Sequence, residues 1–204
     1  MFYYACPRRS RHKMREQTYE RLKRLASNIP NLLSIFRIVL IPFFIWQMLV
    51  GNTWNAGVIL ILSGFTDMFD GMLARRFGWI TELGKVLDPV ADKMTQISVS
   101  LVLLYVMRQY WVFFIIIITK EFMVMMICGM LLKRKVEFKG ALWFGKISTT
   151  IYYVAMVMII FWPGMLEFQL LLLLTVTTLC SLVSAIMYIP VFIRAVLRKN
   201  TNIV

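Results

Sequence analysis

Residues 67–92 read DMFDGMLARRFGWITELGKVLDPVAD, and they contain five of the ten acidic residues of this 204-residue chain. The segments on either side, VILILSGFT at 58–66 and ISVSLVLLYVM at 97–107, are apolar enough to lie in a lipid bilayer. A charged side chain at the centre of a bilayer costs at least about 2.5 kcal/mol. Carboxylates gathered between two such segments therefore predict a functional site that faces a polar cavity.

The composition places the whole chain in a membrane. It is 60% hydrophobic, whereas soluble domains are roughly 45–50% apolar. Long apolar runs account for the excess, at residues 32–50, 54–77, 82–107, 110–132, 141–161 and 166–193. A helix of about 20 residues crosses a bilayer. We therefore expect an all-α integral membrane protein with about six transmembrane helices.

The formal net charge of +13 fits three kinds of partner: nucleic acid, an anionic membrane surface or a phosphorylated substrate. The apolar runs speak against nucleic acid. Residues 13–26 repeat apolar positions at helical spacing between basic residues, which predicts an amphipathic juxtamembrane helix on the membrane surface. Residues 1–12 are expected to be a solvated tail. The expected organisation is a basic tail with this helix at 1–27, a membrane domain at 28–194 and a basic tail at 195–204.

Basic residues alternate between the connections of the expected spans. The N-terminal tail, the second connection, the fourth connection and the C-terminus are basic, whereas the first, third and fifth connections contribute only Arg108. Connections rich in Lys and Arg stay in the cytoplasm. The pattern predicts that both termini and the 67–92 segment face the cytoplasm of a multi-pass cell-membrane protein.

The acids of this segment are spaced to share helix faces. Asp67 and Asp70 lie three residues apart, and Asp88 and Asp92 lie four apart, so each pair occupies one face of its helix. A short turn between the helices makes them antiparallel neighbours, and the two pairs can face each other. Four carboxylates so close repel one another unless they are protonated or bound to cations.

The residues around the acids favour a metal-bound diphosphate. Oxygen-only ligands suit Mg²⁺, Mn²⁺ or Ca²⁺ better than zinc, and four carboxylates suit a two-metal site. Gly71 and Gly84 let a bulky ligand approach the backbone, and Arg75 and Arg37 can bind phosphates. Two other interpretations use the same acids: intramembrane salt bridges, and a divalent-cation channel or transporter, which the accompanying arginines disfavour.

The pattern Asp67-x2-Asp70-Gly71-x2-Ala74-Arg75-x8-Gly84-x3-Asp88-x3-Asp92 resembles the full signature of the CDP-alcohol phosphotransferases. The resemblance implies a membrane enzyme in which an acceptor hydroxyl displaces CMP from a CDP-linked donor. It also implies a homodimer. Carried onto this chain, the four aspartates would hold two Mg²⁺ or Mn²⁺ ions, with Asp92 also the candidate base for the acceptor hydroxyl. Gly71, Ala74, Arg75 and Gly84 would line the CDP pocket.

The opening segment NIPNLLSIFR at 28–37 resembles the phosphatidylglycerophosphate synthases of that family. This implies CDP-diacylglycerol as donor and glycerol 3-phosphate as acceptor, with Asn31, Ser34 and Arg37 near the nucleotide and phosphates. Candidates for the acceptor phosphate are Lys85, Lys120, Lys139 and Lys146. The element that is usually Arg-Glu in these synthases reads Lys120-Glu121 here, and lysine offers no bidentate fork. A cardiolipin synthase with phosphatidylglycerol as acceptor is the alternative.

Overall fold

The computed structural model describes residues 29–77, 84–133 and 142–197. Short connections join the helices, and no β-strand occurs among these residues, so the expected all-α class is confirmed for this part of the chain. The amphipathic helix expected at 13–26 and the tail at 1–12 lie outside it. In order the elements are α2 (Ile29–Leu49), α3 (Thr53–Phe77), α4 (Gly84–Val106), the 3-10 turn η1 (Arg108–Tyr110), α5 (Trp111–Lys133), α6 (Leu142–Phe161) and α7 (Glu167–Leu197).

The helices follow the apolar runs, and a glycine marks the first turn between them. Gly51 has φ +83°, a left-handed conformation that suits glycine after a helix end. Its N–H donates to the carbonyl of Met48 at 3.1 Å, which closes α2. Pro42 lies inside α2 without ending it. The turn expected at 78–81 falls in the segment outside the described residues, and α7 continues past the expected end of the membrane domain at residue 194.

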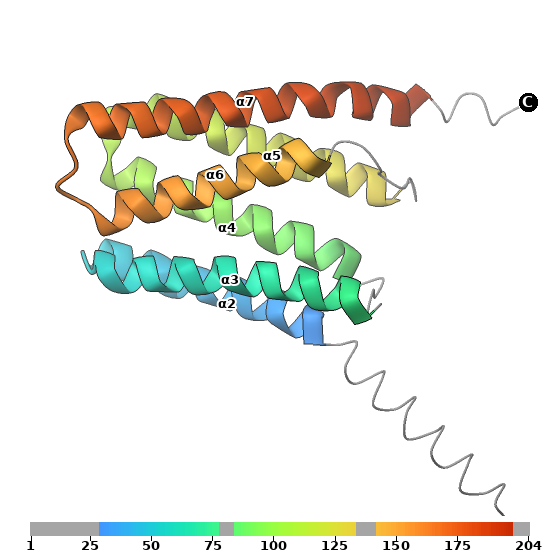
Figure 1. Cartoon of the computed structure of the whole chain (residues 1–204), viewed down its shortest axis with the longest axis horizontal. Helices are drawn as coiled ribbons and strands as arrows, with labels where there is room; N and C mark the ends of the chain where they lie inside the picture. Colours follow the sequence, from blue (N-terminus) through green and yellow to red (C-terminus); the bar gives the residue numbers. More distant parts are fainter. Residues whose placement is uncertain (1–28, 78–83, 134–141, 198–204) are drawn as a thin grey trace, which may run out of the picture.

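The six α-helices close a ring (Figure 1). Around it, α2 packs on α4, α4 on α5, α5 on α7, α7 on α6, α6 on α3, and α3 on α2. Buried apolar side chains from all six of these helices meet in its core: Phe44, Leu60, Val99, Phe114, Met156 and Leu174. Every helix therefore has one side toward a shared interior and one toward the surroundings.

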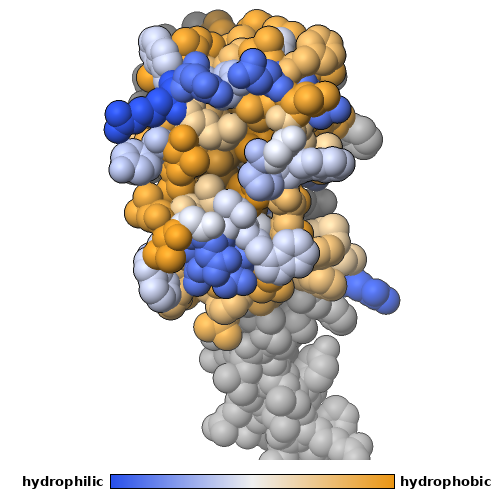
Figure 2. All heavy atoms as spheres, turned by 90° about the vertical axis from the view of Figure 1, so that its left-hand side faces the viewer, coloured by the Kyte–Doolittle hydropathy of each residue, from blue (hydrophilic) through white to orange (hydrophobic). Residues whose placement is uncertain are grey.

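Polar and apolar residues are distributed as in a membrane bundle. Large apolar side chains such as Trp46, Phe168 and Ile186 are exposed, whereas Arg37 and Glu121 are buried. Lipid accepts the exposed apolar surface, and charged groups in membrane helices face the bundle interior. Figure 2 looks at the end that carries the α2–α3, α4–α5 and α6–α7 connections, where hydrophilic patches interrupt the apolar surface.

Three of the described helices are long and apolar enough to cross a membrane. Their spans are Asn31–Leu49, Arg108–Ile127 and Glu167–Pro190, and Gly145–Phe161 forms a shorter apolar helix. Helices α3 and α4 have 25 and 23 residues, which is sufficient length, but their acids lower the mean hydropathy. The chain is a membrane protein, and six spans remain a prediction that this geometry accommodates.

Candidate active site

Arg37 is the central cation of the site. It lies in the third turn of α2 and its side chain is completely buried. Its Nη1 donates to Oδ1 of Asp67 on α3 at 2.5 Å. Asp67 keeps 38% of its side chain exposed, so one side of this carboxylate stays open to a ligand. Arg37 therefore faces the polar interior of the bundle.

Ser34 joins α2 to α4 as Arg37 joins α2 to α3. It lies one turn before Arg37 on the same buried face of α2, and its hydroxyl donates to Oδ1 of Asp88 on α4. Helix α2 packs against both α3 and α4. Two donors one turn apart on α2 thus bind an acid from each neighbouring helix, which fixes the separation of the two acidic helix ends.

Asp92 lies one turn after Asp88 and is bound by residues of α4 and α6. The amide of Gln96 donates to its Oδ1 at 3.0 Å, and the hydroxyl of Tyr153 lies 3.5 Å from the same oxygen. The ammonium of Lys93 lies 3.4 Å from Oδ2. Residues of α4 and α6 thus hold the side chain of Asp92, and the carboxylate on the α3 side is that of Asp67.

The charges of the two helices act on one another. Asp92 and Asp88 both lie near enough to Asp67 for their negative charges to act on it, Asp92 more strongly. Arg37 offsets part of this repulsion. The described side chains contain no group of three His, Cys, Asp or Glu residues arranged around one ion. The donor set is nevertheless all oxygen and repels itself, and hard divalent cations are the ions that such a set accepts.

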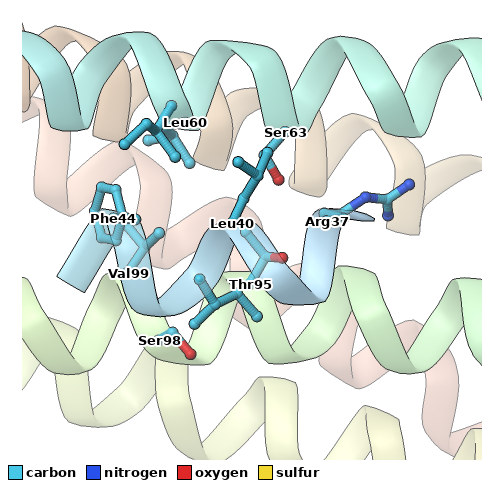
Figure 3. A pocket seen from close by; sticks show the side chains of 10 residues that line it. Arg37, Leu40, Phe44, Leu60, Ser63, Thr95, Ser98 and Val99 are labelled. Carbon is cyan, nitrogen blue, oxygen red and sulfur yellow. The ribbon is translucent and has the colours of Figure 1, made fainter. Parts of the chain in front are cut away.

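A small pocket continues from Arg37 toward the middle of the bundle (Figure 3). Apolar side chains from α2, α3 and α4 line most of it, among them Phe44, Leu60 and Val99, with Ser63 and Thr95 between them and Arg37. Arg37 therefore lies where the charged part of the site meets the apolar interior of the bundle.

A second set of charges adjoins Asp92 and lies between α4 and α5. Glu121 of α5 is buried, and its Oε2 lies 2.7 Å from Nζ of Lys93, while its Oε1 contacts the ammonium of Lys120. On the other side of Asp92, the hydroxyl of Tyr152 donates to the carbonyl of Gln96 at 2.8 Å. The carboxylates are thus embedded in a buried polar network.

Residues 27–193 match the family model of the CDP-alcohol phosphatidyltransferases. The chain belongs to this family. It is 31% identical over 172 residues to proteins named CDP-diacylglycerol–glycerol-3-phosphate 3-phosphatidyltransferase from Escherichia coli strain K12 and Shigella sonnei strain Ss046, with 79% of this chain and 93% of each relative covered. It is an enzyme of phospholipid biosynthesis that transfers a phosphatidyl group, and the family assignment expected from the aspartate signature is confirmed.

The structure brings several residues of the family signature together and leaves others outside the described side chains. Arg37 binds Asp67 and Ser34 binds Asp88, and Asp92 lies near enough to Asp67 for their charges to interact. Asn31 is half-buried one turn before Ser34, and Gly84 is buried at the start of α4. Outside the described side chains are Asp70, Gly71, Ala74 and Arg75 on α3, Lys85 on α4, and Lys139 between α5 and α6.

Two of the lysines expected near the acceptor phosphate are described, and they differ. Lys146 is exposed on α6. Lys120 is buried and its ammonium contacts Glu121, so a bound phosphate would share it with an existing carboxylate. The Lys120-Glu121 element, which differs from the usual Arg-Glu, thus forms an internal ion pair in this phosphatidyltransferase.

Sequence reasoning missed the residues that surround Asp92. Lys93 and Gln96 follow Asp92 at i+1 and i+4, so helical spacing could have identified Gln96 as its neighbour. Tyr153 and Glu121 are 61 and 29 positions away along the chain, and only the packing of α6 and α5 on α4 and α3 brings them near. No local pattern signals such contacts.

Proposed function

We propose that this phosphatidyltransferase moves the phosphatidyl group of CDP-diacylglycerol to a hydroxyl of glycerol 3-phosphate and releases CMP. The observation that carries the proposal is the ion pair between buried Arg37 and Asp67 of α3, near enough to Asp92 and Asp88 of α4 for the charges of the three acids to interact. The names of the relatives support both substrates. Those names favour glycerol 3-phosphate over phosphatidylglycerol as the acceptor.

The donor set fits two divalent cations, Mg²⁺ or Mn²⁺. Asp67, Asp70, Asp88 and Asp92 would hold them, because four carboxylates on facing helices supply hard oxygen ligands and need positive charge between them. When bound, such ions neutralise the diphosphate and the departing CMP. Arg37 and Ser34 tie α3 and α4 to α2, since their bonds reach Asp67 and Asp88 from α2.

Asp92 is the residue assigned to proton transfer. In the proposed reaction the acceptor hydroxyl oxygen bonds to the phosphorus that carries diacylglycerol, and the bond from that phosphorus to the oxygen of CMP breaks. The hydroxyl proton passes to Asp92 and then leaves to solvent. Gln96 and Tyr153 support this role because both contact Oδ1 and fix the carboxylate, as a positioned general base requires.

The remaining residues divide between the two substrates. For the donor, buried Arg37 is suited to a phosphate. The proposed donor-binding residues are Asn31, Ser34, Arg37, Gly71, Ala74, Arg75 and Gly84. The proposed residues for the acceptor phosphate are Lys85, Lys120, Lys139 and Lys146.

We place the acidic site on the cytoplasmic side of the cell membrane, with both termini on that side. The charge alternation of the connections supports this orientation. Asp67 lies in the half of α3 away from the α2–α3 connection, and Asp88 and Asp92 lie in the half of α4 away from the α4–α5 connection; these two connections share one end of the bundle (Figure 1). The membrane domain would cover residues 28–194 with six spans and work as a homodimer, as the family resemblance implies.

The test is Asp92→Asn in purified protein supplied with CDP-diacylglycerol, glycerol 3-phosphate and Mg²⁺. The amide keeps the shape of the side chain but cannot accept the proton, so we expect CMP release to fall by at least about 100-fold. Binding of CDP-diacylglycerol, followed by its protection against heat unfolding, is expected to persist. A variant that releases CMP at the wild-type rate would remove Asp92 from this role.

A further inference from the structure

Glu121 is a buried carboxylate that the family signature does not contain. Only 2% of its side chain is exposed, compared with 17% for Asp92 and 38% for Asp67. Two ammonium groups neutralise it, those of Lys93 and Lys120. A buried charge is costly unless it is paired, so a carboxylate at this depth on α5 needs the two lysines.

Lys93 is shared unequally between two carboxylates. Its Nζ lies 2.7 Å from Oε2 of Glu121 and 3.4 Å from Oδ2 of Asp92. The shorter contact is an ion pair by distance and not a directed hydrogen bond. Nζ also donates to the side-chain oxygen of Gln96 at 3.3 Å, and the Gln96 amide donates to Asp92 at 3.0 Å. Lys93 and Gln96 therefore link Glu121 to Asp92.

This geometry determines where the ammonium of Lys93 lies. Coulomb attraction grows as the separation falls, and it is strong where water is excluded. With Glu121 charged, the nearer carboxylate holds Lys93 on the α5 side. Without that charge, Asp92 is the remaining carboxylate in contact with Lys93. The ammonium would then move onto the oxygens of Asp92 that the acceptor hydroxyl requires.

We propose that Glu121 is a positioning residue for the transfer reaction. It holds Lys93 away from Asp92 and so keeps the carboxylate of Asp92 available and correctly oriented, with Gln96 as the second support. The inference rests on the proposed role of Asp92. It gives the Lys120-Glu121 element of α5 a role in the reaction that acts through Lys93 of α4.

The competing explanation is that Glu121 only stabilises two buried lysines. Both explanations predict a less stable protein when Glu121 is neutralised. They differ in how Lys93 behaves. If the Lys93 ammonium binds Asp92 in the Glu121 variant, removing Lys93 from that variant restores turnover. A purely structural role instead predicts that the losses of turnover caused by the two substitutions add.

The experiment compares Glu121→Gln, Lys93→Met and the double variant, with Glu167→Gln as a matched control. Glu167 is an exposed acid in the first turn of α7 at the opposite end of the bundle. For Glu121→Gln we expect kcat for CMP release to fall about tenfold, with the KM for CDP-diacylglycerol within about twofold of wild type. The double variant is expected to be faster than Glu121→Gln, and Glu167→Gln should match wild type.

Glu121→Asp covers the case in which the glutamine variant does not fold. Aspartate keeps the negative charge, but its side chain is one methylene shorter, which moves the carboxylate away from Lys93. The kcat of this variant should therefore fall below that of wild type, with the KM for the donor unchanged. Size-exclusion chromatography in detergent checks that each variant is folded. A wild-type kcat in folded Glu121→Gln, or a double variant no faster than Glu121→Gln, would overturn the inference.

Asp92→Asn is measured in the same series to separate this inference from the proposed function. An inactive Asp92→Asn with a fully active Glu121→Gln contradicts only the positioning role. An active Asp92→Asn contradicts the assignment of the base itself, whatever the Glu121 variants do.

Discussion

Arg37 and Ser34 lie one turn apart on α2 and bind one acid each from α3 and α4. This makes α2 the helix that sets the distance between the two acidic segments. Helical spacing in the sequence places Asp67 and Asp88 on suitable faces, and it places Ser34 and Arg37 on one face of α2. It does not reveal which donor meets which acid, because that depends on how three helices pack.

Arg37→Lys tests the buried cation. Lysine keeps the charge but loses the planar fork that can bind Asp67 and a phosphate together. A charge-assisted hydrogen bond contributes about 1.5–3 kcal/mol, so we expect the KM for CDP-diacylglycerol to rise about tenfold or more, with a smaller loss in kcat. Arg108→Lys is the matched control, since Arg108 is exposed against the ring of Tyr105. Equal KM values for the two variants would contradict the donor role of Arg37.

At the scale of elements, Gly57 of α3 makes room for a ring of α6. A methyl group on Gly57 would overlap three ring carbons of Phe161 at the end of α6. The same ring packs edge-on against Trp54 with 4.9 Å between centroids. Helix α6 carries Tyr153, so this contact also fixes the helix that reaches Asp92.

Gly57→Ala is therefore expected to destabilise the protein by about 1–3 kcal/mol through overpacking, although alanine favours helices. Gly64→Ala is the control on the same helix, because its methyl group would lie 3.8 Å from the ring of Tyr153, an ordinary contact. Thermal unfolding in detergent should give a lower midpoint for Gly57→Ala and an unchanged or higher one for Gly64→Ala. The reverse order would contradict the packing of α3 on α6.

The helices could be predicted well because long apolar runs need little context. Each expected run corresponds to a helix in the described residues, and Gly51 ends α2 between the first two runs. Helices α3 and α4 are harder to recognise as membrane spans, because the acids that form the proposed site lower their mean hydropathy. The helix pairing lay beyond prediction, because contacts such as α3 with α6 join distant parts of the chain.

At the scale of the whole molecule, the ring of six helices explains how one protein can serve two unlike substrates. Its apolar outer surface suits lipid, whereas its interior holds charged groups at one end and an apolar pocket beside them. In the proposed reaction, a lipid-linked diphosphate would enter from the membrane, and a water-soluble acceptor would reach the acids from the cytoplasm. The family signature predicted this chemistry, but the polar network between α4, α5 and α6 emerged only from the fold.

The most direct test of the account is CMP release by the purified protein with CDP-diacylglycerol, Mg²⁺ and one acceptor at a time. The acceptors are glycerol 3-phosphate, phosphatidylglycerol and inositol phosphate, and a reaction without acceptor gives the background. The account predicts CMP release above background only with glycerol 3-phosphate, and its loss when Mg²⁺ is chelated. Release only with phosphatidylglycerol, or undiminished release after chelation, would contradict it.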